Sequence, residues 1–375
     1  MADNLGSVAR PFLEVRPILR SIGIASDPRK LILAVLGLLA MIGGWAALDR
    51  VIEPTRKPGL TQVQPGSTIR SVDYPTVESL RDAARLMVEP PRSVIGPFAS
   101  LFERRSGPAR WFRSALMALW SITVWGIFGG AIARVAVVQA SVGHRVGIGS
   151  ALRFALRKSG SLIGAPLTPW LAISIFSAIL AAFGLIHRIP GGVGRTIAEV
   201  LGFFPLVLGL LMAFILLGLA AGWPLMHLTV AAEGEDAADA LSRSYSYVNQ
   251  RFIRYASHLA LAWGVGTVGL IGVIWFARAV LMLSDWGVAL GAPATDPASS
   301  LGSFWVVLVG WLVHGWIYSY FWSATAIIYL ILRRDVDGTD WHDVYLPEQD
   351  ADSFAGETPL GMTEVAIKSE TSEVA

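Results

Sequence analysis

The chain has 375 residues, of which 54% are apolar and only 15% are charged. Soluble globular domains carry about 25% charged residues, so this composition does not fit a soluble protein. Because the apolar residues occur in long runs, the sequence predicts an all-α membrane protein with several spans. Cysteine is absent, which excludes disulfides, iron–sulfur clusters, thiolate metal sites and cysteine nucleophiles.

The formal net charge is +2, but the charge is distributed unevenly along the chain. Residues 1–332 hold 27 Lys and Arg against 17 Asp and Glu, whereas residues 333–375 hold 3 against 11. Many of the arginines adjoin apolar runs, where anionic lipid headgroups are the simplest partner. We therefore expect membrane lipids as partners and no nucleic acid.

Six apolar stretches are long enough to cross a hydrocarbon core of roughly 30 Å, which needs about 20 helical residues. They are residues 31–48, 115–137, 167–186, 203–232, 256–277 and 304–332. Pro224 predicts a kink in the fourth stretch. The first stretch follows thirty residues and lacks a small-x-small cleavage site, so we interpret it as a retained anchor.

These stretches predict an organisation in five parts. Residues 1–30 form a basic N-terminal segment, residues 31–48 the first transmembrane helix, residues 49–113 an extramembrane or interfacial loop, residues 114–332 a helical bundle of five spans, and residues 333–375 an acidic, largely disordered tail.

The loop contains apolar residues at helical spacing, ending before Pro90 and Pro91, and then a short amphipathic piece around Phe98. Prolines disfavour a continuing helix, so the spacing predicts two short helices in place of one long helix. The loop has too few apolar residues for a core of its own. We therefore expect these helices to lie on the membrane surface.

Two further amphipathic segments follow the second and fourth spans. The later one predicts a helix over residues 234–255, with acidic residues in its first turns and arginines in its last. Its apolar stripe consists of Ala237, Leu241, Tyr245, Val248, Phe252 and Tyr255. We expect this helix to be the contact site for any protein partner. Residues 150–152 resemble residues 239–241, which indicates a repeated unit of span, surface helix and span.

The distribution of basic residues predicts an orientation. If the N-terminus is cytoplasmic, short segments on that side carry 13 Lys and Arg, against 2 in the opposite short loops. The positive-inside rule then places both termini in the cytoplasm. The loop over 49–113 holds 11 Lys and Arg on the other side, but it is long enough for the rule to lose force.

Ionisable residues inside apolar runs are functional candidates, and the main ones here are His314, Arg134 and Arg278. Both arginines lie near predicted span ends, where a long side chain can reach the interface. His314 lies well inside the sixth span, although no carboxylate lies deep in any predicted span to partner it. A small permease with a cavity near His314 is therefore the alternative function.

The segment Asp335-Val336-Asp337-Gly338-Thr339 matches the first motif of haloacid-dehalogenase-like phosphatases. That motif requires a preceding buried strand and a following α/β domain, whereas this segment follows a membrane span. We therefore predict no enzyme, no catalytic residue and no cofactor. A weak divalent-cation site remains an option, although Gly338 is misplaced for an EF-hand loop. Its oxygen ligands would be Asp335, Asp337, Asp340 and Asp343.

The segment from Glu233 to Ser244, with Asp236, Asp239 and Arg243, resembles one found in uncharacterised multi-span bacterial membrane proteins. It is also similar to the membrane domain of some glycerophosphodiester phosphodiesterases. The resemblance covers about residues 115–330 and implies an all-helical bacterial inner-membrane protein. It implies no catalytic residues, because the phosphodiesterase domain is missing. The leading expectation is a non-enzymatic scaffold or a membrane protein that interacts with partners or lipids.

Overall fold

The computed structural model describes residues 13–52, 77–102, 107–190, 192–291 and 303–345. The regular structure in these ranges is helical, without strands, and six helices are long and apolar enough to cross a membrane. This confirms the predicted fold class. The spans are α2 (Pro28–Ile52), the continuous helix formed by α6 (Pro108–Val124), the π-helical turn η2 (Trp125–Gly129) and α7 (Gly130–Ser141), α9 (Ser159–Gly184), α11 (Phe203–Glu233), α13 (Phe252–Gly291) and α14 (Ser303–Asp337).

Shorter helices precede or connect the spans. They are α1 (Val15–Ala25), α4 (Val77–Leu86), α5 (Glu89–Ala99), η1 (Ser100–Phe102), α8 (Ile148–Arg157), η3 (Leu185–Arg188), α10 (Val193–Val200) and α12 (Ala237–Gln250). The order α7–α8–α9 recurs as α11–α12–α13, so a short helix joins two spans in both places.

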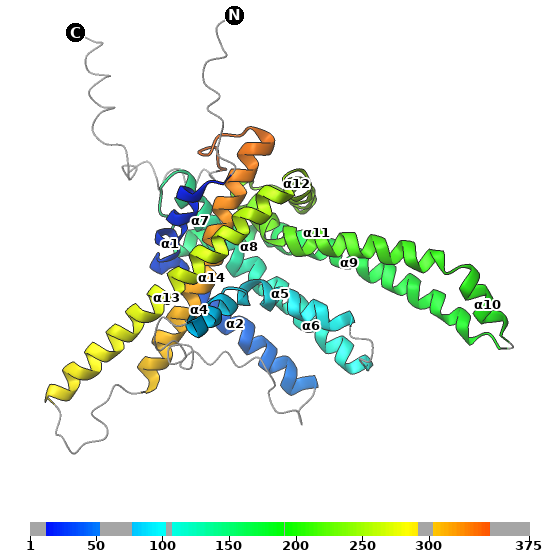
Figure 1. Ribbon diagram of the computed structural model, residues 1–375, viewed down its shortest axis with the longest axis horizontal. Coiled ribbons are helices and arrows are strands. Elements are labelled where there is room, and N and C mark those ends of the chain that lie inside the picture. Colours follow the sequence, from blue (N-terminus) through cyan, green and yellow to red (C-terminus); the bar gives the residue numbers. More distant parts are fainter. Residues whose placement is uncertain (1–12, 53–76, 103–106, 191, 292–302, 346–375) are drawn as a thin grey trace, which may run out of the picture.

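The helices meet at one end of the molecule and diverge from it (Figure 1). We call this region the polar end, formed by α1, α8, α12, the last turns of α14 and residues 338–345. Its contacts join ends of different spans. The Arg254 side chain of α13 lies 3.0 Å from the carboxylate of Glu14, just before α1, and Trp341 donates to Ala140 O of α7 at 2.9 Å. Successive long helices therefore alternate in direction.

Each of these helices is longer than the apolar run that predicted it. The fifth span was expected over residues 256–277, whereas α13 runs through 40 residues and is about 60 Å long at 1.5 Å per residue. This is about twice the hydrocarbon thickness, so α13 must tilt or protrude. Hydropathy alone therefore underestimates these helices, because it stops at the first polar residues.

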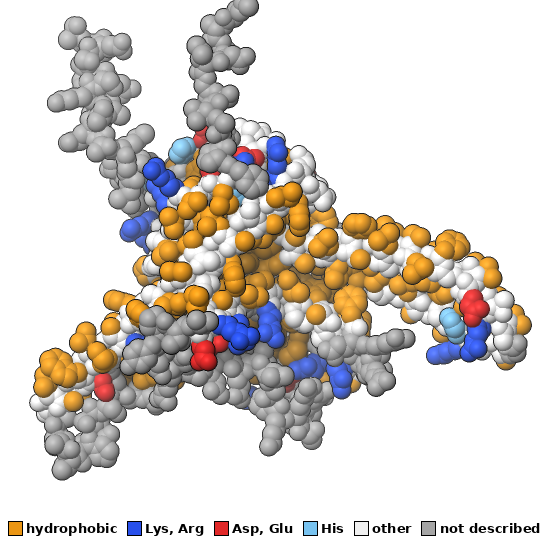
Figure 2. Space-filling view, in the orientation of Figure 1, with side chains coloured by type: hydrophobic (Ala, Val, Ile, Leu, Met, Phe, Trp, Pro, Cys, Tyr) orange, Lys and Arg blue, Asp and Glu red, His pale blue; other side chains and the backbone are white. Residues whose placement is uncertain are grey.

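The pair α9 and α11 projects away from the bundle and carries α10 at its tip (Figure 1). Apolar side chains cover the projection (Figure 2). Leu206 is 75% exposed and Phe214 is 63% exposed, although both lie on a helix with no charged residue before Glu233. Only lipid or another apolar surface can cover such a helix pair in a membrane. The α11 helix ends at Glu233 and is followed by Gly234, whose φ of +70° is the left-handed conformation that glycine adopts readily.

The predicted single helix over 234–255 is wrong in one respect, because the chain breaks at Arg251. Asp236 caps α12, accepting hydrogen bonds from the backbone N–H of Ala238 and Asp239 at 2.9 and 3.0 Å. Val248 is buried as the stripe requires, but Phe252 begins α13 and is 54% exposed. One apolar stripe therefore serves two helices with different surroundings.

The two helices of the loop between the first and second spans are packed against the bundle. The helix α4 contacts α13, while α5 contacts α6 and α14, and a position at the membrane surface stays a prediction. Val94 and Phe98 of α5 are buried. Pro90 and Pro91 lie in the first turn of α5, where proline is tolerated because the N–H groups of that turn have no intrahelical acceptor.

Candidate functional site

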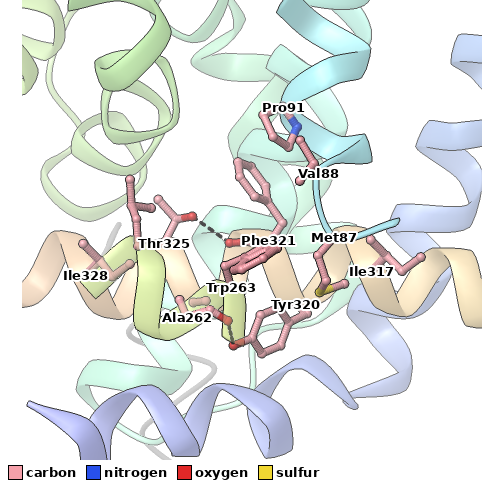
Figure 3. A pocket seen from close by; sticks show the side chains of 12 residues that line it. Met87, Val88, Pro91, Ala262, Trp263, Ile317, Tyr320, Phe321, Thr325 and Ile328 are labelled. Carbon is pink, nitrogen blue, oxygen red and sulfur yellow. Dashed lines mark hydrogen bonds between the residues drawn. The ribbon is translucent and has the colours of Figure 1, made fainter. Parts of the chain in front are cut away.

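A cavity of about 200 Å³ lies between the α4–α5 pair and the helices α13 and α14 (Figure 3). Trp263 and Val88 in its wall are 49% and 46% exposed, so the cavity opens to the outside of the bundle. Its walls are formed by Met87, Val88, Pro91, Leu259, Ala262, Trp263, Ile317, Tyr320, Phe321, Ala324, Thr325 and Ile328.

The polar groups in this wall are already engaged in hydrogen bonds. The Tyr320 hydroxyl and the Thr325 hydroxyl each donate to a backbone carbonyl, of Ala262 and Phe321 respectively, at 2.7 Å (Figure 3). The Trp263 indole N–H donates to Ala84 O at 3.0 Å. The cavity therefore presents hydrocarbon to a ligand, without a spare donor from these side chains.

A second cavity of about 80 Å³ lies on the other side of α5. It is lined by Val94, Ile95, Phe98, Ala99, Phe102, Ile122, Pro166, Leu216, Leu219, Ala220 and Trp223. Phe321 of the first cavity stacks on Trp223 of the second, with ring centroids 5.6 Å apart and planes 19° apart. The helix α5 and this aromatic pair thus separate two apolar spaces.

Glu89, the first residue of α5, is an acidic residue that lies in the sequence between Val88 and Pro91, which line the first cavity. Its side chain is half-buried, and its Oε2 atom is buried without a hydrogen-bond partner among the described residues. Burial raises the pKa of the Glu89 carboxyl to about 7, against a smaller opposing effect of Arg92. The sequence interpretation missed this residue, although an acidic residue directly before two prolines is a visible signal.

The buried charges of the polar end surround Glu233, whose side chain is 7% exposed. It accepts a hydrogen bond from the Tyr329 hydroxyl and forms ion pairs with Arg333, at 3.1 Å, and with Arg243. Nearby, the Tyr247 hydroxyl donates to Asp337. Burial, followed by the hydrogen bond to Asp337, raises the pKa of Tyr247 above its ordinary range. This cluster joins α11, α12 and α14, and its paired charges indicate a structural role.

The Arg134 side chain forms hydrogen bonds within the protein. It is fully buried and donates from one Nη atom to Ala231 O at 2.9 Å and to Tyr345 O at 2.6 Å. Its guanidinium also lies 4.7 Å from the ring centroid of Phe154. The arginine therefore donates to a carbonyl in the last turn of α11 and holds residue 345 in place, which explains its charge inside an apolar run.

The other two intramembrane candidates lie apart from Arg134. Arg278 is half-buried in the second half of α13. His314 is buried, with Nδ1 3.1 Å from Gly310 O on the preceding turn of its own helix. Neither of the two cavities described above is lined by His314. The structure thus places the three predicted residues in separate environments.

The four aspartates proposed as a cation site face different partners. Asp335 and Asp337 belong to the last turn of α14, and Asp335 pairs with Arg254 at 2.8 Å. Asp340 is exposed, and hydrogen bonds from the His342 backbone N–H and ring lower the pKa of its carboxyl. The part of the chain that the structure describes holds no group of three His, Cys, Asp or Glu suited to a metal ion.

The first residues of the predicted tail fold back onto the polar end. Tyr345 N–H donates to Ala232 O at 2.8 Å, Val344 is 9% exposed, and Arg333 donates to Asp343 O. The predicted division at residue 333 therefore does not coincide with the end of the packed structure. Residues 346–375 lie outside the described residues.

Comparison with protein-family models, with curated proteins and with solved structures finds no match to this chain. The resemblance of residues 115–330 to the membrane domain of glycerophosphodiester phosphodiesterases stays a prediction.

Proposed function

We propose that the chain is a non-enzymatic multi-pass membrane protein that binds lipid, with a hydrocarbon chain seated in the cavity between α4–α5 and α13–α14. The observation that supports this proposal is the chemistry of the wall, which is apolar and has its side-chain donors bound to backbone carbonyls. An apolar ligand gains from such a site, whereas a polar ligand would lose its hydrogen bonds to water.

The volume of the cavity limits the size of the group that it can bind. Sites for drug-sized molecules measure roughly 300–1,000 Å³, and this cavity of about 200 Å³ is smaller. It suits a segment of one acyl or isoprenoid chain, while the rest of the lipid stays in the bilayer. The exposed sides of Trp263 and Val88 leave a path between the two.

The alternative, a permease with a cavity near His314, lacks support from the two cavities described. A protein partner at α12 stays an expectation, because the exposed residues of that helix are mostly polar, as on any hydrated helix.

Filling the cavity should weaken lipid contact at this site. Ala324 is 3% exposed and lines the wall, so Ala324→Phe places a ring where the chain would lie. With a phospholipid that carries a photoreactive diazirine in its acyl chain, we expect the labelling of residues 87–91 and 259–263 to fall about tenfold, which corresponds to about 1.4 kcal/mol of binding. Labelled peptides are identified by mass spectrometry.

Two further variants make the result decisive. Ala262→Leu fills the same cavity from α13 and should reduce labelling even if Ala324→Phe folds poorly. Val207→Phe adds the same ring to an exposed site on α11 and should change nothing at residues 87–91. Unchanged labelling in both cavity variants would overturn the proposal.

We further propose that the protein resides in a bacterial inner membrane with its polar end and both termini in the cytoplasm. The excess of basic residues in the short segments at that end supports this orientation. Single cysteines at Ser150, Ser242 and Ser353 should then all be shielded from a membrane-impermeant thiol reagent in intact cells. The natural absence of cysteine removes background labelling. Labelling at Ser242 but not at Ser150 would contradict the topology.

A further inference from the structure

Glu89 is half-buried where three helices meet. It begins α5, which packs against α6 and α14, and it acts electrostatically on Tyr318. Tyr318 lies near the middle of α14, is 2% exposed, and stacks on Trp125 with centroids 4.6 Å apart and planes 9° apart. Trp125 belongs to the π-helical turn, a distortion that is frequent at functional sites. The carboxyl therefore lies within electrostatic range of Tyr318, a buried residue of α14.

The backbone around Glu89 offers no free N–H group to its carboxylate. A carboxylate at a helix N-terminus is ordinarily stabilised by free backbone N–H groups of the first turn. Here the next two residues, Pro90 and Pro91, have no N–H, and the Arg92 N–H donates to Val88 O at 3.1 Å. The Ser93 hydroxyl donates to Pro90 O at 2.8 Å. These groups therefore leave Oε2 without a partner.

The charged and titratable neighbours do not replace those donors. Arg92, on the same helix, is exposed, so water screens its charge. Arg85 and Asp82 of α4 pair with each other at 3.3 Å, and Trp125 is uncharged. Tyr318, from α14, is a second group within electrostatic range of the carboxyl, and it is neutral near pH 7. An ionised Glu89 would thus be a poorly compensated charge in an apolar setting.

We propose that Glu89 is an exchangeable proton-binding site at the first turn of α5, the helix that packs against α6 and α14. The ligand is a proton, because one carboxyl group without neighbouring acidic ligands cannot satisfy a metal ion; the described residues hold no such cluster. A pKa of about 7 supports the proposal, since both protonation states are then populated near neutral pH. The site does not depend on lipid binding.

A hydrophobic carbodiimide tests the site directly, because it adds to protonated carboxyl groups in apolar surroundings. The full chain in lipid vesicles is treated with dicyclohexylcarbodiimide between about pH 6 and pH 8, and the adducts are located by mass spectrometry. We expect labelling of Glu89 to fall about tenfold over this range, as the protonated fraction of a group with a pKa near 7 does. Glu78, exposed on α4, is the control and should react at least tenfold less near pH 6.

Stability provides a second, independent measurement. Because the pKa of Glu89 is higher in the folded state, the folded state binds more protons, so wild-type stability should fall as the pH rises from about 4.5 to 7. The variant Glu89→Gln stays neutral and should lose this component, so its melting temperature should exceed that of the wild type above about pH 7. Equal carbodiimide labelling of Glu89 and Glu78, or the same pH profile in wild type and Glu89→Gln, would overturn the proposal.

Discussion

Replacing Glu233 with Gln is expected to destabilise the folded protein by about 3–5 kcal/mol, the range measured when one partner of a buried ion pair is removed. The carboxylate is 7% exposed and forms ion pairs with two arginines, Arg333 and Arg243. It also accepts a hydrogen bond from the Tyr329 hydroxyl. Arg333 is itself only 8% exposed, so its guanidinium would stay buried beside a neutral amide. Three helices, α11, α12 and α14, would lose their common anchor.

The matched control is Glu235→Gln, two residues further along. Glu235 lies 3.5 Å from Arg243, but its side chain is 34% exposed, so water screens the pair and we expect a loss below about 1 kcal/mol. Thermal unfolding in detergent should separate the two variants. At about 2 °C per kcal/mol, the melting temperature of Glu233→Gln should lie roughly 6–10 °C below that of the wild type, and that of Glu235→Gln less than about 2 °C below it. Equal melting temperatures would show that the Glu233 cluster contributes little to the fold.

Hydropathy was sufficient for the six spans because their apolar runs exceed what any soluble helix needs. It failed at the ends of the helices, where polar residues continue the backbone hydrogen bonding. The break between α12 and α13 at Arg251 cannot be predicted from the apolar pattern, for a related reason. Val248 faces the bundle and Phe252 is exposed, yet both are apolar, so the stripe continues across the break. Sequence patterns cannot distinguish apolar contacts with protein from apolar contacts with lipid.

The buried polar groups were harder to predict, because their partners lie far away in the sequence. Arg134 contacts carbonyls 97 and 211 residues away, so an arginine that looked able to reach the interface is fully enclosed. Glu89 was overlooked because the loop that contains it was expected on the membrane surface. Its burial follows from the packing of α5 against α6 and α14, which no local pattern reveals.

The C-terminal region provides the second prediction with a large expected effect. A chain that ends at residue 337 should be less stable than the full chain by about 3 kcal/mol, because removal of residues 338–345 leaves buried groups without partners. Arg134 loses Tyr345 O, Arg333 loses Asp343 O, and the carbonyls of Ala140 and Ala232 lose their donors.

The loss of about 3 kcal/mol comes from the buried groups that stay in the shortened chain without partners. The contacts of the deleted residues are largely offset by the entropy regained when about eight residues are no longer ordered, at roughly 1–2 kcal/mol each. A chain that ends at residue 346 keeps every contact in this set, so its melting temperature should stay near that of the full chain, because the deleted residues 347–375 are acidic and poor in apolar side chains. Comparing the two truncations by thermal unfolding tests where the packed structure ends. A large loss at 346 would place further stabilising contacts beyond it, and no loss at 337 would show that water satisfies Arg134 and Arg333 without the segment.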